Sequence, residues 1–146
     1  MEKYKDSELN EFSILGMKQT KNHFCFKTEN VPDTLKLSLM PYIIAINLKK
    51  ILIVRFIAFF VDKSNNVISN KFIFQMYFKF SEMPVHLKND NIEIPNIDII
   101  VSVLDTTIGA LRCALYKWLS KSEYQSPLPL VEMEGILKQT QFSFVK

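Results

Sequence analysis

The residues best suited to catalysis or metal binding are few and widely spaced. The chain has two His and two Cys, which are His23, His86, Cys25 and Cys113. A zinc site needs three or four convergent ligands, and neither His lies beside a Cys or a carboxylate at ligand spacing. We therefore expect no metal site and no cofactor.

Nucleophilic catalysis has no support in the residue pattern either. A Cys nucleophile needs a base and an oxyanion site, and Cys113 follows Arg112 with no His near it in sequence. Both Cys lie in apolar segments, so we interpret them as buried, reduced thiols. The three Gly are scattered and form no phosphate-binding loop. We predict that the protein is not an enzyme.

One set of charged residues has regular spacing. Asp98, Asp105 and Arg112 follow one another at intervals of seven, which places them near one face of a predicted helix. They could form a polar strip in a cleft, or simply a solvated helix face. The pattern favours the solvated face.

The charge balance argues against nucleic acid as a partner. The chain has 18 basic and 15 acidic residues and a net charge of +3. Only Arg55 and Arg112 are Arg, and Arg is the usual bidentate ligand of phosphate and guanine. We expect protein partners instead.

Length and composition predict one domain. The 146 residues are 48% hydrophobic and include 12 Phe, which is ample material for a single core. Residues 1–11 are polar, and we expect a flexible N-terminal arm there, followed by one domain over residues 12–146.

A membrane span is not expected. The segment Pro41–Val61 is very apolar, but Lys49, Lys50 and Arg55 interrupt it, and a spanning helix needs about 20 apolar residues. The N-terminus lacks the apolar core of a secretory signal, so we expect a cytoplasmic protein without membrane insertion.

The clearest elements are two strands joined by a hairpin. Ile51–Val61 is rich in β-branched and aromatic residues and is apolar on both faces. The polar segment Asp62–Asn66 predicts a hairpin loop, and Phe72–Phe80 alternates with period two as the return strand.

Two weaker strands precede this hairpin. Phe12–Lys27 predicts a long first strand with a bulge or bend at Gly16. Leu35–Met40 alternates as a second strand that Pro41 interrupts, which suggests that the strand lies at an edge or is bulged there. Tyr42–Ile46 could extend it beyond the break.

A long helix follows these strands. Apolar residues recur at three- and four-residue intervals from Ile97 to Trp118. Asn96 is suited to the N-cap, and Gly109 predicts close packing in mid-helix. Ser126–Pro129 then breaks regular structure before a short extended or helical ending, and QFSFVK is a last alternating piece.

Together these elements predict an α+β fold. We expect a curved antiparallel β-sheet of about four strands, with the long amphipathic helix and the short C-terminal element packed on one face. The second apolar face of Ile51–Val61 then needs a cover, which would be a helix of the same chain, another subunit or a client polypeptide.

The order of these pieces resembles the SecB export-chaperone family and its bacterial SecB-like relatives. The shared features are the long first strand, the Pro-interrupted second strand, the hairpin ILIVRFIAFFVDKSNN to KFIFQMYFKF, and the long helix IVSVLDTTIGALRCALY followed by SPLPLVEM. The resemblance covers about residues 12–133. Two departures are Cys113, where the family often has Gly, and the slightly basic charge, where export-type members are acidic.

The resemblance implies a holdase-type chaperone, with a link to protein export among the expectations. Such proteins assemble as homodimers or homotetramers and hold non-native polypeptides in apolar grooves. Carried over, the peptide-binding residues would be Tyr42, Phe59, Tyr77 and Leu128. The alternative is a dedicated protein–protein interaction module on the same fold, such as a toxin–antitoxin-associated or immunity-type factor.

Overall fold

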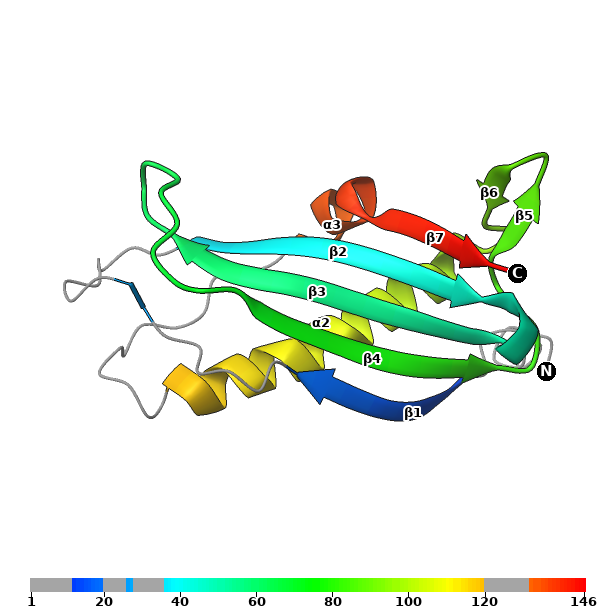
Figure 1. Ribbon diagram of the computed structural model, residues 1–146, viewed down its shortest axis with the longest axis horizontal. Helices are drawn as coiled ribbons and strands as arrows, with labels where there is room; N and C mark the ends of the chain where they lie inside the picture. The colour runs from blue at the N-terminus through cyan, green and yellow to red at the C-terminus, as the bar shows by residue number, and fades with distance from the viewer. Residues whose placement is uncertain (1–11, 20–25, 28–35, 120–131) are drawn as a thin grey trace, which may run out of the picture.

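The computed structural model describes residues 12–19, 26–27, 36–119 and 132–146. A mixed sheet of five strands in the order β1-β4-β3-β2-β7 lies in front of the long helix α2 (Figure 1). A two-stranded hairpin, β5-β6, lies at one end. The bounds are β1 Phe12–Gln19, β2 Lys36–Ile46, η1 Asn47–Lys49, β3 Ile51–Val61, β4 Phe72–Phe80, β5 His86–Lys88, β6 Asn91–Glu93, α2 Ile97–Leu119, α3 Met133–Gln139 and β7 Gln141–Val145.

The central hairpin β3-β4 has the predicted bounds. Its strands pair antiparallel from Ile51 opposite Lys79 to Ala58 opposite Phe72. The loop after Val61 is closed by the Asp62 N–H, which donates to the Asn66 carbonyl at 3.0 Å. Alternating aromatic and β-branched residues thus produce the strands, and a polar loop produces the turn.

The predicted break at Pro41 is wrong. Strand β2 runs without interruption through Pro41 and pairs in register with β3 over its whole length, with Pro41 opposite Phe56. A proline lacks only its own N–H, so a strand tolerates it where a neighbouring strand is absent on one side. At Pro41 β2 has β3 on one side, and β7 pairs with it only from Tyr42 onward.

The described part of the predicted first strand is β1, Phe12–Gln19. Strand β1 ends at Gln19, and residues 20–25 lie outside the described part of the chain. A register shift between Ile14 and Gly16 confirms the predicted bulge. Further along, Phe26 forms an isolated bridge with Ser69.

The C-terminal strand makes the sheet mixed rather than purely antiparallel. Strand β7 pairs in parallel with β2, from Tyr42 opposite Gln141 to Ile46 opposite Val145. Parallel partners need a long connection, and here most of the chain separates the two strands. Sequence periodicity detected the alternation of QFSFVK but could not assign its partner. It also did not reveal the β5-β6 hairpin.

The core lies between the sheet and α2. Even-numbered residues of β3 and β4 point toward the helix, and Phe56, Phe60 and Phe78 are completely buried there. The helix contributes Leu104 and Leu111, both 0% exposed. The α+β arrangement with helices on one face of the sheet is therefore confirmed.

Helix α2 begins and is oriented as its sequence predicts. The Asn96 side-chain oxygen accepts the Asp98 backbone N–H at 3.1 Å, the expected N-terminal capping contact. By length and composition alone, Ile97–Trp118 could cross a bilayer. Its apolar stripe, however, is buried against the sheet, and this packing accounts for the apolar composition.

Two expectations about α2 are wrong. Gly109 is exposed and has no neighbouring atom within 4 Å of an added Cβ, so it does not serve close packing. Cys113 is an exposed free thiol rather than a core residue. Leu111 and Leu115 face the sheet, and a residue two positions from each points to the opposite side of a helix. Cys25 lies outside the described residues.

Candidate polypeptide-binding site

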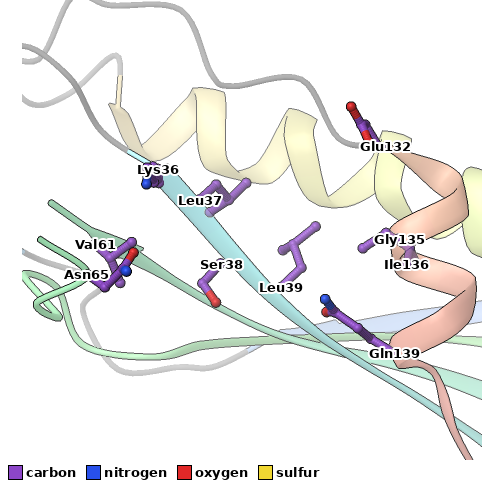
Figure 2. Close-up of a pocket in the computed structure, with 10 residues that line it drawn as sticks. All are labelled: Lys36, Leu37, Ser38, Leu39, Val61, Asn65, Glu132, Gly135, Ile136 and Gln139. Atoms are coloured by element: carbon purple, nitrogen blue, oxygen red, sulfur yellow. The ribbon is translucent and has the colours of Figure 1, made fainter. Parts of the chain in front are cut away.

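A groove lies between the first half of β2 and the short helix α3 (Figure 2). Its cavity volume is about 340 Å³, near the small end of the range for ligand pockets. Leu37, Leu39 and Val61 contribute apolar walls from the sheet, and Ile136 contributes one from α3. The groove is therefore open and apolar at its base.

Helix α3 is held in place by one buried anchor. Ile136 is 6% exposed and belongs to the main core, while Glu134 and Lys138 on the exposed side form an i,i+4 ion pair at 3.5 Å. Gly135 lines the groove beside this anchor, with no atom within 4 Å of an added Cβ. The lack of a side chain at Gly135 thus leaves the cavity open on this side.

The rim of the groove is polar. Lys36 and Ser38 lie on β2, Asn65 on the β3-β4 loop, and Glu132 and Gln139 at the two ends of α3 (Figure 2). Polar groups around an apolar base can hydrogen-bond a polypeptide backbone while its side chains enter the cavity. The rim contains one basic and one acidic residue, so it should favour neither acidic nor basic ligands.

The loop that carries Asn65 is fixed by one carboxylate. Asp62 accepts the backbone N–H groups of Ser64 and Asn66, both at 2.9 Å. The hydrogen bond from the Asn66 backbone is the main cause that lowers the pKa of Asp62 below its usual 3.8. Asn65 takes a positive φ of 64°, a conformation that Asn tolerates better than most residues.

The groove also borders an unpaired strand edge. Strand β7 covers β2 from Tyr42 to Ile46, and in the described part of the chain no strand pairs with Lys36–Pro41 on that side. An unpaired edge presents backbone donors and acceptors that a further extended segment can use. The groove therefore combines free backbone groups with an apolar cavity.

The predicted peptide-binding residues lie elsewhere. Tyr42, Phe59 and Tyr77 all lie on the side of the sheet that faces away from α2, but Phe59 and Tyr77 are six register positions apart, and none of the three lines the groove. Leu128 lies outside the described residues. The assignment of these four residues to peptide binding stays a prediction.

Sequence reasoning missed the groove because its two walls are distant in sequence. Leu37 and Leu39 alternate in a recognisable strand, but nothing local indicates that α3 returns beside them. The one available signal was Pro41, which marked β2 as an edge strand. Its edge character predicted the exposed backbone but not the helix that closes the cavity.

The side of the sheet away from α2 is a second feature, which we call the outer face. It consists of the even-numbered residues of β2, the odd-numbered residues of β3 from Ile51 to Phe59, and the odd-numbered residues of β4. All of them are half-buried or exposed. In Figure 1 the strands pass in front of α2, and no described helix lies in front of them. Within the described ranges, a helix of the same chain does not supply the expected cover.

The described residues contain no set of side chains suited to metal binding. No group of three or more His, Cys, Asp or Glu is placed to hold an ion there. The described residues thus offer a groove and an apolar outer face.

Taken together, the chain has a SecB-like fold, as the resemblance implied. It superimposes with a TM-score of 0.58 on the Mycobacterium tuberculosis SecB-like chaperone Rv1957, solved in complex with a ChAD peptide from the Rv1956 HigA1 antitoxin. The two chains are 12% identical, and the match covers 87% of this chain and 94% of that one. No family model and no curated protein matches the sequence.

Proposed function

We propose that the protein is a non-enzymatic polypeptide-binding chaperone that takes up extended client segments in the groove between β2 and α3. The observation that carries this proposal is that no described strand pairs with Lys36–Pro41 on the side of the groove, whose base is apolar and whose rim is polar. A client segment would continue the line of β7 along β2. The solved SecB-like chaperone that binds an antitoxin peptide supports a polypeptide ligand.

Two physical terms would drive such binding. Backbone hydrogen bonds to β2 give affinity without sequence preference, and the cavity selects apolar side chains at alternate positions. Burial contributes about 25 cal/mol per Å² of apolar surface, before the cost of ordering the client is subtracted. The result is broad and moderate affinity, which suits a holdase.

The test is to fill the groove without damaging the fold. Gly135→Leu places a side chain in the cavity and replaces a helical Gly, which should raise helix propensity by about 1 kcal/mol. Gly109→Leu is the matched control, because Gly109 is also helical and also has no atom within 4 Å of an added Cβ, while it lies on the exposed side of α2 away from the groove. Aggregation of several reduced or heat-unfolded clients is followed by light scattering at stoichiometric ratios.

We expect wild type and Gly109→Leu to suppress aggregation, and Gly135→Leu to need about tenfold more protein for the same effect. No suppression by the wild type with any client would remove the chaperone function. Equal suppression by both variants would move the binding site away from the groove.

A dedicated partner is the second candidate. The SecB-like neighbour was solved with a peptide from one antitoxin, so the same groove could serve one partner instead of many clients. Pull-down from the native host separates the two functions. One stoichiometric partner favours the dedicated module, and many weak clients favour the chaperone.

We further propose that the protein acts in the cytoplasm as a homodimer or homotetramer. Among the described strands β1 pairs only with β4, and its other edge supports self-association. Ile14, Leu15 and Met17 are 51%, 55% and 62% exposed on this strand. Large exposed apolar side chains on an edge strand are typical of an interface.

A further inference from the structure

We propose that the outer face of the sheet is a second docking surface, which adjoins the groove at Lys36 and Ser38, for a protein surface that combines apolar and acidic side chains. The outer face is broad because it spans three adjacent strands. It presents six Ile, at positions 44, 46, 51, 53, 57 and 73. Ile73 and Met40 remain 39% and 36% exposed. Contiguous apolar surface of this kind marks an interaction site.

A row of polar residues crosses the middle of this apolar surface. The pairing register places Gln141, Tyr42, Arg55, Gln75 and Lys18 side by side across the sheet. Apolar residues flank the row on both sides along β2 and β3. A partner that covers the face must therefore also satisfy this row, because buried polar groups without partners are costly.

Arg55 is held in a fixed position within the row. Its Nε donates to the Gln75 side-chain oxygen at 2.7 Å, and the Gln75 amide nitrogen donates to the Tyr77 hydroxyl at 2.5 Å. This chain of hydrogen bonds uses only Nε of the guanidinium. The two Nη groups remain for a partner, and a carboxylate is the ligand that matches their geometry.

The charges on the outer face have one sign. Its charged side chains are Lys36, Arg55 and Lys79, and Lys18 on the neighbouring strand β1 lies on the same side of the sheet beside Gln75. None of the described strands places a carboxylate there. Complementary charge fixes the choice and orientation of partners. An acidic apolar partner therefore fits this face.

A second copy of the chain fits less well. Two outer faces packed against each other would bring four basic side chains of one copy onto the same four of the other, and like charges at an interface are unfavourable. RNA also fits less well, because branched aliphatic residues dominate the face while base stacking requires aromatic platforms. The observations thus favour a different protein with acidic groups.

The test uses Ile methyl NMR, because Ile residues mark each surface separately. The six Ile listed above report on the outer face, Ile136 reports on the groove, and Ile43 and Ile100 report on the core. The probe is a short amphipathic peptide with Leu and Phe on one side and Glu between them. The same peptide with Gln, or with Lys, in place of Glu is the comparison, and a uridine oligonucleotide is a further arm.

We expect the Glu peptide to shift the outer-face methyls, with affinity about tenfold higher than that of the Gln peptide and further reduced by salt. Shifts confined to Ile136, equal affinity of the three peptides, or displacement of the peptide by the oligonucleotide would each overturn the proposal. Concentration-dependent shifts of all six outer-face Ile methyls without peptide would identify a second copy as the occupant of this face and overturn the proposal as well, whereas shifts confined to Ile14 would report association at the β1 edge.

Two variants connect the effect to Arg55. Arg55→Met keeps the apolar stem and removes the charge, while Lys88→Met removes an exposed positive charge from β5, off the face. Arg55→Met should weaken Glu-peptide binding about tenfold and Lys88→Met should leave it unchanged. Unchanged Ile43 and Ile100 signals establish that each variant is folded. The Gly135→Leu variant should bind this peptide normally, so failure of the groove function leaves this proposal intact.

Discussion

At the scale of single residues, a few polar groups stabilise the sheet where its regular pairing ends. Ser69 is completely buried, and its hydroxyl accepts the Phe60 backbone N–H at 2.8 Å and donates to the Asn70 carbonyl at 2.9 Å. Asp62 closes the neighbouring loop. Both residues replace strand-to-strand hydrogen bonds beyond the last pair of the β3-β4 ladder.

Replacing Ser69 should therefore be costly. Ser69→Ala removes the acceptor of a buried N–H group, which should lower the free energy of unfolding by about 1–3 kcal/mol. Chemical denaturation measures this change. Ser64→Ala in the exposed loop is the control, with an expected change within about 0.5 kcal/mol. Equal stability of the two variants would mean that water or another group satisfies Phe60.

The Asp62 carboxylate should make stability depend on pH in one direction. Its pKa is lowered in the folded state, so its contribution is present above the unfolded value of 3.8 and is lost as the pH falls through the folded pKa. Asp62→Ala should be less stable than wild type at neutral pH, and the difference should shrink below pH 3.8. Thermal unfolding across acidic pH measures it. A difference that persists unchanged in acid would contradict the assignment.

At the scale of elements, the sequence pattern predicted those features that depend on residues close together in the chain. The bounds of β3 and β4 and the start of α2 follow from alternation, periodicity and an N-cap, and the structure confirms them. The partner of β7 and the position of α3 depend on contacts between distant segments. No periodicity could indicate them, which is why the sheet was expected to have about four strands and why the groove was missed.

Helix α2 offers a test of how the core is packed. Leu104 is 0% exposed against the sheet, and its neighbour Asp105 is exposed. Leu104→Ala should lower the free energy of unfolding by about 2–5 kcal/mol through lost burial and a cavity. Asp105→Ala should change it by less than about 0.5 kcal/mol. A small effect at Leu104 in denaturant unfolding would show that the helix does not pack as described.

At the scale of the whole molecule, the fold separates its binding surfaces. The groove lies at the β2 edge beside α3, and the outer face lies on the side away from α2. The edge of β1 that pairs with no described strand lies across the sheet from β2. A client, a partner and a second subunit would therefore use largely different surfaces, although the groove and the outer face share Lys36 and Ser38. Because Ile51–Val61 is apolar on both faces, its sequence predicted that the second face of the sheet is covered. It could not specify whether a client, a partner protein or a second subunit covers it.

The β1 edge is the place to test self-association. Met17→Lys adds a charge at a position that is 62% exposed, and charged residues on an edge strand prevent pairing with another sheet. We expect the variant to be monomeric where wild type is a dimer or tetramer, as measured by light scattering. Leu48→Lys, on the exposed η1 turn, is the matched control. A monomeric wild type at high concentration would contradict the predicted assembly.

The parallel pairing of β7 with β2 also has a kinetic consequence. Because roughly a hundred residues separate the paired positions, closing this contact carries a large entropic penalty and should come late in folding. During that interval the edge of β2 opposite β3 remains open to other strands along its whole length. A nascent molecule would thus pass through a stage that is itself prone to aggregation, and the arrival of Gln141–Val145 would end it.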